Sequence, residues 1–157
     1  MSDTNPKILE HFQNPRNIGS IENADGYARG ENPVNGYITD IYIKIENERI
    51  TVIKYKTFGC IVTVASASAL SEIVKGKTLN EIINGQDPLV LLMNLMKREL
   101  GDIPEKNWHC SPTAIQVLLS AISNYYRKNK DEKKVEKIEK TLVDIKSYFK
   151  IRLEEQK

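Results

Sequence analysis

Residues 49–74 read RITVIKYKTFGCIVTVASASALSEIV, and the sequence changes there from a strand pattern to a helix pattern. Ile50, Val52 and Ile53 carry the strand pattern, which continues to Phe58. The alternating alanines and serines of residues 65–69 predict a helix that packs tightly against a sheet. A glycine at position 59 permits a tight turn between them, so we expect residue 60, a cysteine, at a strand-to-helix turn.

A hairpin is predicted from the residues on either side of position 47. Residues 37–45 alternate between apolar and polar, with Ile41, Ile43 and Ile45 on one face, and residues 46–48 form a turn before the strand at 49–58. Residues 24–30 are a candidate third strand. We expect the remaining helices at 6–12, 61–74, 78–85, 88–100 and 111–126. Strands that precede most of the helices indicate an α+β domain.

The C-terminal segment has a different character. Residues 127–157 hold 11 basic and 7 acidic residues, a net charge of +4, and they predict a charged amphipathic helix. Its apolar residues follow a 3-4-3-4 spacing: Val135, Ile138, Leu142, Ile145 and Phe149. Barely two heptads are unstable alone, so this helix should pack on the body of the protein or on a partner. We therefore divide the chain into a domain at 1–126 and a helical extension at 127–157.

Composition describes an ordinary globular protein of 157 residues, with 40% hydrophobic and 28% charged residues. No apolar run is long enough for a membrane span, and the N-terminus does not resemble a signal peptide. We therefore expect a cytoplasmic protein with reduced thiols and without membrane partners. The net charge of +2 gives no reason to expect a nucleic-acid partner.

Cys60 and Cys110 are the only cysteines, and both are expected just ahead of a helix N-terminus. Free N–H groups at such a terminus favour a thiolate over a thiol. His109 precedes Cys110, so two thiols and an imidazole are candidate ligands for a metal or a sulfur site, one short of four-coordination. Buried structural cysteines are the alternative. A catalytic Cys-His pair is disfavoured because sequence neighbours seldom meet productively, and we expect His11 to be structural.

Several segments together resemble one protein family. They are HFQNPRNIG at 11–19, KTFGC at 56–60, ASAS at 65–68, KGKTL at 75–79 and HCS at 109–111. In this order and at these intervals, they resemble the iron–sulfur cluster assembly scaffolds known as IscU, SufU and the N-terminal domain of NifU. The resemblance covers about residues 7–126 and does not include the tail.

The resemblance implies a three-stranded antiparallel sheet with packed helices, and a scaffold or carrier rather than an enzyme. Such proteins receive sulfur from a cysteine desulfurase, assemble a [2Fe-2S] cluster and pass it to recipient apoproteins. The implied ligands are three cysteines, an aspartate two residues after the first cysteine, and a histidine before the third. Cys60 matches the second cysteine, and His109 and Cys110 match the histidine and the third cysteine.

The loop that carries the first ligand departs from the family. Residues 33–37 read PVNGY, where the family has Pro-x-Cys-Gly-Asp, so Asn35 replaces the cysteine and Tyr37 the aspartate. A neutral amide is a poor ligand for the soft iron of a cluster, and a phenol of ordinary pKa near ~10 is mostly protonated.

Three readings remain open. In the first, the protein is a scaffold that binds iron or a [2Fe-2S] cluster through Cys60, His109 and Cys110, with the missing ligand supplied by a second subunit, a partner or a small thiol. In the second, it is a regulatory paralogue that docks on the desulfurase or on an intact scaffold. In the third, it is a sulfur acceptor that holds zinc.

Overall fold

The predicted hairpin forms two strands, β2 and β3, of a three-stranded antiparallel sheet with the order β1-β2-β3. The computed structural model describes residues 5–85 and 87–157. β1 is Gly26–Glu31, β2 is Ile38–Glu46 and β3 is Arg49–Thr57. Asn47 and Glu48 connect β2 to β3 with positive φ at both residues, as in the tight hairpin turns that match strand twist. The predicted fold class, α+β with this sheet, is therefore confirmed.

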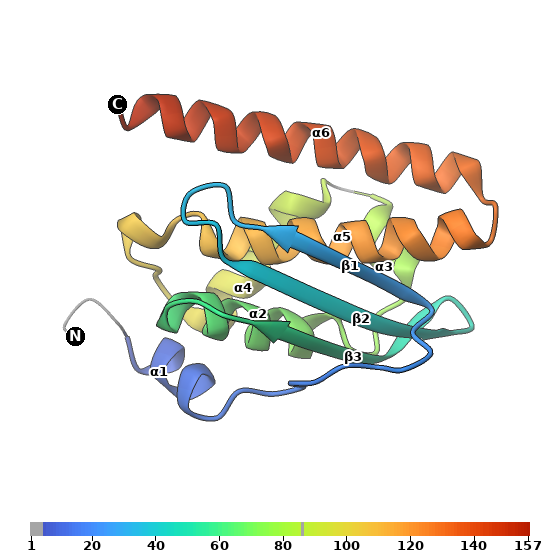
Figure 1. Cartoon of the computed structure of the whole chain (residues 1–157), viewed down its shortest axis with the longest axis horizontal. Helices are drawn as coiled ribbons and strands as arrows, with labels where there is room; N and C mark the ends of the chain where they lie inside the picture. Colours follow the sequence, from blue (N-terminus) through green and yellow to red (C-terminus); the bar gives the residue numbers. More distant parts are fainter. Residues whose placement is uncertain (1–4, 86) are drawn as a thin grey trace.

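One face of the sheet is covered by α2 (Ile61–Val74) and α5 (Cys110–Lys128), which lie behind it in Figure 1. The inward residues Ile41 and Ile43 are buried, whereas Ile45, which follows a register shift after Lys44, is half-buried. The other helices are α1 (Pro6–Gln13), α3 (Leu79–Ile83), α4 (Pro88–Leu100), the 3-10 helix η1 (Glu105–Asn107) and α6 (Glu132–Glu155).

The small residues of α2 are explained by its surroundings. This helix contacts β3, α1, α4 and α5, so it is enclosed on nearly all sides. Residues 65–71 are all buried. Alanine and serine let neighbouring elements approach closely without voids. The packing against the sheet that the sequence predicts is confirmed.

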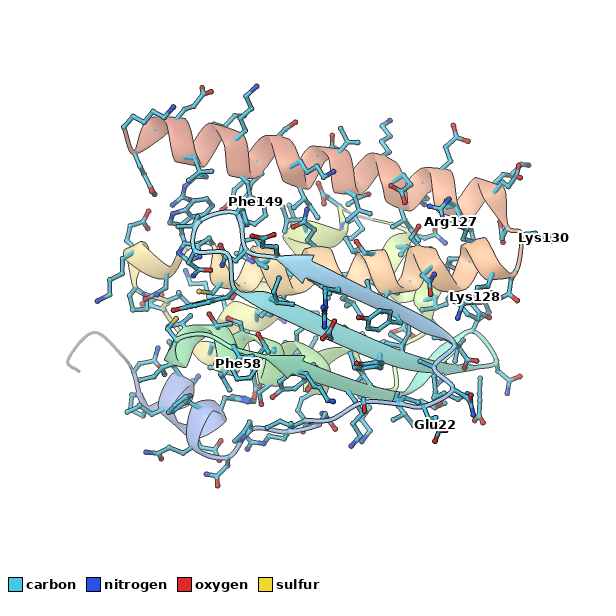
Figure 2. The ribbon with its side chains drawn as sticks, in the orientation of Figure 1. Glu22, Phe58, Arg127, Lys128, Lys130 and Phe149 are labelled. Atoms are coloured by element: carbon cyan, nitrogen blue, oxygen red, sulfur yellow. The ribbon has the colours of Figure 1, made fainter. Side chains whose placement is uncertain are left out.

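The C-terminal helix packs on the body of the protein. α6 runs along α5 (Figure 1), and Ile138, Leu142, Ile145 and Phe149 of the predicted apolar stripe are buried against it. Its charged residues lie on the remaining faces, and Figure 2 shows Arg127, Lys128 and Lys130 at the α5–α6 connection. Within the described ranges, each helix is too short or too polar to cross a membrane.

Candidate functional site

Cys60 and Cys110 approach each other at the N-termini of α2 and α5. Cys60 is the N-cap residue of α2, as predicted. Cys110 is the first residue of α5 and His109 its N-cap, so the prediction that Cys110 precedes the helix is wrong. Pro112 suggested the later start, but proline is tolerated throughout a first turn whose N–H groups have no partners.

Thr63 links the two thiols. Its Oγ1 lies 3.4 Å from Cys60 Sγ and 3.6 Å from Cys110 Sγ. Gly59 makes this arrangement possible, because a Cβ at position 59 would lie 2.7 Å from Thr63 Cβ. Asn107 completes the surroundings of Cys60, since its Nδ2 donates to the sulfur at 3.7 Å.

His109 is buried beside Cys110. Its Nδ1 lies 3.8 Å from Cys110 Sγ and 2.8 Å from Nδ2 of Asn32, the residue that follows β1. The Trp108 ring packs edge-on against the imidazole at a centroid distance of 5.6 Å. His109 is therefore held between the β1–β2 loop and an aromatic side chain.

α6 supports this end of the site through Trp108. The indole lies 5.7 Å from the Phe149 ring and 6.0 Å from the Tyr148 ring, measured between centroids. Arg152 lies 4.7 Å above the indole and bonds Glu105 of η1 at 2.6 Å. The C-terminal half of α6 thus packs against the segment that precedes His109 and Cys110.

The two thiols differ in their protonation. The pKa of Cys60 falls to about 4, chiefly through its hydrogen bond with Cys110 and further through the Thr63 hydroxyl and the first N–H groups of α2. The hydrogen bond to Cys60 and burial raise the pKa of Cys110. Burial lowers the pKa of His109, because it disfavours the charged imidazolium. At neutral pH the site therefore holds a thiolate, a thiol and a neutral imidazole.

Asn35 and Tyr37, the loop residues at the positions of two expected family ligands, are exposed. Asn35 Oδ1 accepts a hydrogen bond from the Tyr37 backbone N–H at 3.0 Å, so it closes a local turn. Within the described residues, neither side chain hydrogen-bonds to Cys60, His109 or Cys110. Asn35 and Tyr37 therefore bond to each other within the loop.

The three sequence-predicted ligands are neighbours in a hydrogen-bonded chain and are not arranged around a common point. Across residues 5–85 and 87–157, no group of three or more His, Cys, Asp or Glu side chains is arranged to hold a metal ion. Metal ligation by Cys60, His109 and Cys110 therefore stays a prediction. His11 lies elsewhere, with Nδ1 2.8 Å from Ser68 Oγ and Nε2 2.8 Å from Glu99 Oε1, in the structural role expected for it.

Sequence reasoning missed Thr63, Asn107 and Asn32. Only Thr63 carried a signal, because residues three apart share a helix face and Thr63 follows Cys60 by three. Asn107 and Asn32 reach the site through turns, and no local pattern indicates where their amides point.

The fold and site define a small α+β protein whose chemistry is that of an ionised thiol beside a second, protonated one. The chain belongs to the family described as the NifU-like N terminal domain, whose sequence model matches residues 3–132.

The chain is also similar in sequence to individual proteins. The chain is 40% identical over 147 residues to the iron-sulfur cluster assembly scaffold protein IscU 1 of Archaeoglobus fulgidus, covering 88% of this chain and 92% of that protein. It is 37% identical over 126 residues to the protein named IscU in Aquifex aeolicus, covering 79% and 76%. The match to the archaeal protein covers more residues than the 126 of the expected domain, so it includes part of the segment 127–157. The family resemblance seen in the sequence did not include that segment.

Solved structures share the fold. The N-terminal part of a nitrogen-fixing NifU-like protein from Brucella abortus superposes with a TM-score of 0.62 at 22% identity, covering 79% of this chain and 94% of that one. A candidate scaffold of the SUF system from Fervidobacterium islandicum gives 0.61 at 19% identity, covering 77% and 97%.

Proposed function

We propose that this protein is an iron–sulfur cluster assembly scaffold of the IscU type, which accepts sulfur at Cys60 and holds iron or a [2Fe-2S] cluster as cargo. The observation that carries the proposal is the pair of thiols joined by Thr63, with Cys60 as the thiolate. The family membership and the names of the relatives support the same role.

The thiolate of Cys60 is suited to take sulfur from a persulfide on a cysteine desulfurase. It attacks the outer sulfur, and its electron pair forms the new S–S bond. The donor's S–S bond breaks and its electron pair leaves with the donor thiolate, so no external oxidant is needed. Cys60 is the more accessible of the two thiols, because Cys110 is buried.

Cys60, Cys110 and His109 are the proposed ligands of the cargo. Thiolates suit iron–sulfur clusters, and Cys110 must release its proton when it ligates. The fourth ligand comes from a second copy of the chain or from a partner, because Asn35 carries only a neutral amide. The proposed partners are the desulfurase and recipient apoproteins, and the proposed location is the cytoplasm.

Anaerobic reconstitution with ferrous iron and sulfide tests this proposal. We expect visible absorption bands and bound iron in the wild type, with losses in Cys60→Ser and Cys110→Ser. The double variant Asn35→Cys, Tyr37→Asp restores the family ligands and should make the bound cluster more stable. A colourless, iron-free wild type at every protein concentration would refute cluster binding.

A regulatory paralogue is the second candidate, favoured by the exposed turn in which Asn35 bonds to Tyr37 and, in the part of the chain that the structure describes, neither residue bonds to the thiols. Pull-down with the desulfurase distinguishes it, since a regulator should bind equally well as wild type or as Cys60→Ser without a cluster. A zinc-bearing sulfur acceptor is the remaining alternative, and metal analysis of the protein as purified separates zinc from iron.

A further inference from the structure

Asn32 connects the β1–β2 loop to His109. Asn32 is 3% exposed, and its Oδ1 accepts a hydrogen bond from the Val34 N–H at 2.8 Å. Its Nδ2 lies 2.8 Å from His109 Nδ1. The main chain of Asn32 also closes the loop, because its N–H donates to the Tyr37 carbonyl and its carbonyl accepts from the Gly36 N–H.

These contacts show which ring nitrogen of His109 carries the proton. A backbone N–H can only donate, so the Asn32 atom that faces Val34 is the oxygen and the amide NH₂ faces the imidazole. An NH₂ group likewise only donates, so His109 Nδ1 accepts with its lone pair. A neutral imidazole carries one proton, so with Nδ1 accepting from Asn32 the ring proton is on Nε2.

Nδ1 is also the His109 nitrogen that lies beside Cys110, at 3.8 Å from its sulfur. A metal bound by both residues would use the Nδ1 lone pair that now accepts from Asn32. We propose that Asn32 is a positioning residue that holds His109 Nδ1 deprotonated and aimed at the site, and that it gives up this nitrogen when a metal enters. This inference rests on the proposed function.

The exchange couples metal entry to the loop. The side chain that releases His109 also holds the Val34 N–H, so movement of Asn32 loosens the turn that carries Asn35 and Tyr37. Loading of the site should therefore change the environment of the loop at the positions where the family has its other ligands.

The position of the proton is testable in the metal-free protein by ¹⁵N NMR of the imidazoles. The chain has two histidines, and His109→Gln identifies the signals of His109. We expect the Nε2–H tautomer in the wild type. Asn32→Asp keeps an oxygen for Val34 but presents an acceptor to the ring, so the proton should move to Nδ1. An Nδ1–H tautomer in the wild type, or no change in Asn32→Asp, would overturn the assignment.

Titration with Co²⁺ alone tests the exchange. Removing one hydrogen bond that competes with the metal should tighten binding to Asn32→Ala about fivefold. Asn35→Ala is the matched control, because its amide bonds only within the loop, and it should bind as the wild type does. Equal affinity for wild type and Asn32→Ala would refute the role of Asn32. Absence of Co²⁺ binding in all variants would instead refute the metal site of the proposed function, and the exchange with it.

Discussion

Phe149→Ala should destabilise the protein strongly, although residue 149 lies in the C-terminal segment that the sequence sets apart. The ring is 4% exposed and packs against Trp108 and Tyr148, and Figure 2 shows it on α6. Truncation of a buried phenylalanine costs about 3–5 kcal/mol, partly through the cavity that it leaves. For a chain of this size, that corresponds to a fall in Tm of about 6–20 °C. Ile151→Ala, at a residue that is 57% exposed on the same helix, should stay within about 0.5 kcal/mol of the wild type.

Urea denaturation followed by tryptophan fluorescence measures this loss, because the only tryptophan, Trp108, is in contact with Phe149. One transition that moves to lower urea would place α6 within the cooperative core. A cost below about 1 kcal/mol, or a separate early transition, would refute that reasoning and favour an independent extension at 127–157.

Three further predictions concern the site and the sheet. Iodoacetamide should alkylate Cys60 at nearly the same rate from pH 6 to pH 8, because the pKa of Cys60 is about 4. The alkylation rate of an ordinary thiol falls about tenfold for each unit by which the pH drops below its pKa. Cys110 should stay unmodified, and mass spectrometry can verify this. Asp40→Asn should lower Tm at pH 7, because hydrogen bonds from an arginine and a tyrosine lower the pKa of Asp40 in the folded protein. That contribution to stability is present above the unfolded pKa near ~3.9 and is lost as the pH falls below it. The Tm values of wild type and variant should therefore converge in acid, and a constant difference would contradict the ion pair. Gly59→Ala should cost about 1–3 kcal/mol in chemical denaturation because its Cβ collides with Thr63, and adding Thr63→Ala should recover part of that loss.

The sheet was predictable because its signals are local. Alternation along residues 37–45 and a two-residue turn determine a hairpin without reference to the rest of the chain. The apolar spacing of 135–149 likewise predicted a helix that must be covered. The spacing did not predict that α5 covers this helix. A row of apolar residues indicates which face of a helix must be buried, but it does not indicate which element buries that face.

The candidate site was predictable only in part, for a related reason. Cys60, His109 and Cys110 were identified by residue type and by resemblance, but their neighbours depend on long-range contacts. Asn32 lies 77 residues before His109 in the sequence, and only the packing of β1 against α5 brings the two together. The different pKa values of the two thiols depend on another long-range contact, the packing of α2 against α5, because it brings Thr63 and the two helix N-termini together.

The proposed function combines two chemistries, sulfur uptake and cluster ligation, that use different residues of the site. Sulfur uptake needs one accessible thiolate, and Cys60 has the hydrogen bonds that supply it without any residue from the β1–β2 loop. The proposed cluster ligation needs four donors, and the loop has Asn35 and Tyr37 where the family resemblance predicts a cysteine and an aspartate. The loop nevertheless still reaches the site through Asn32, which bonds to the remaining histidine. The proposed function therefore predicts that cluster occupancy rises with the concentration of a second copy or a partner, whereas persulfide formation at Cys60 does not depend on that concentration.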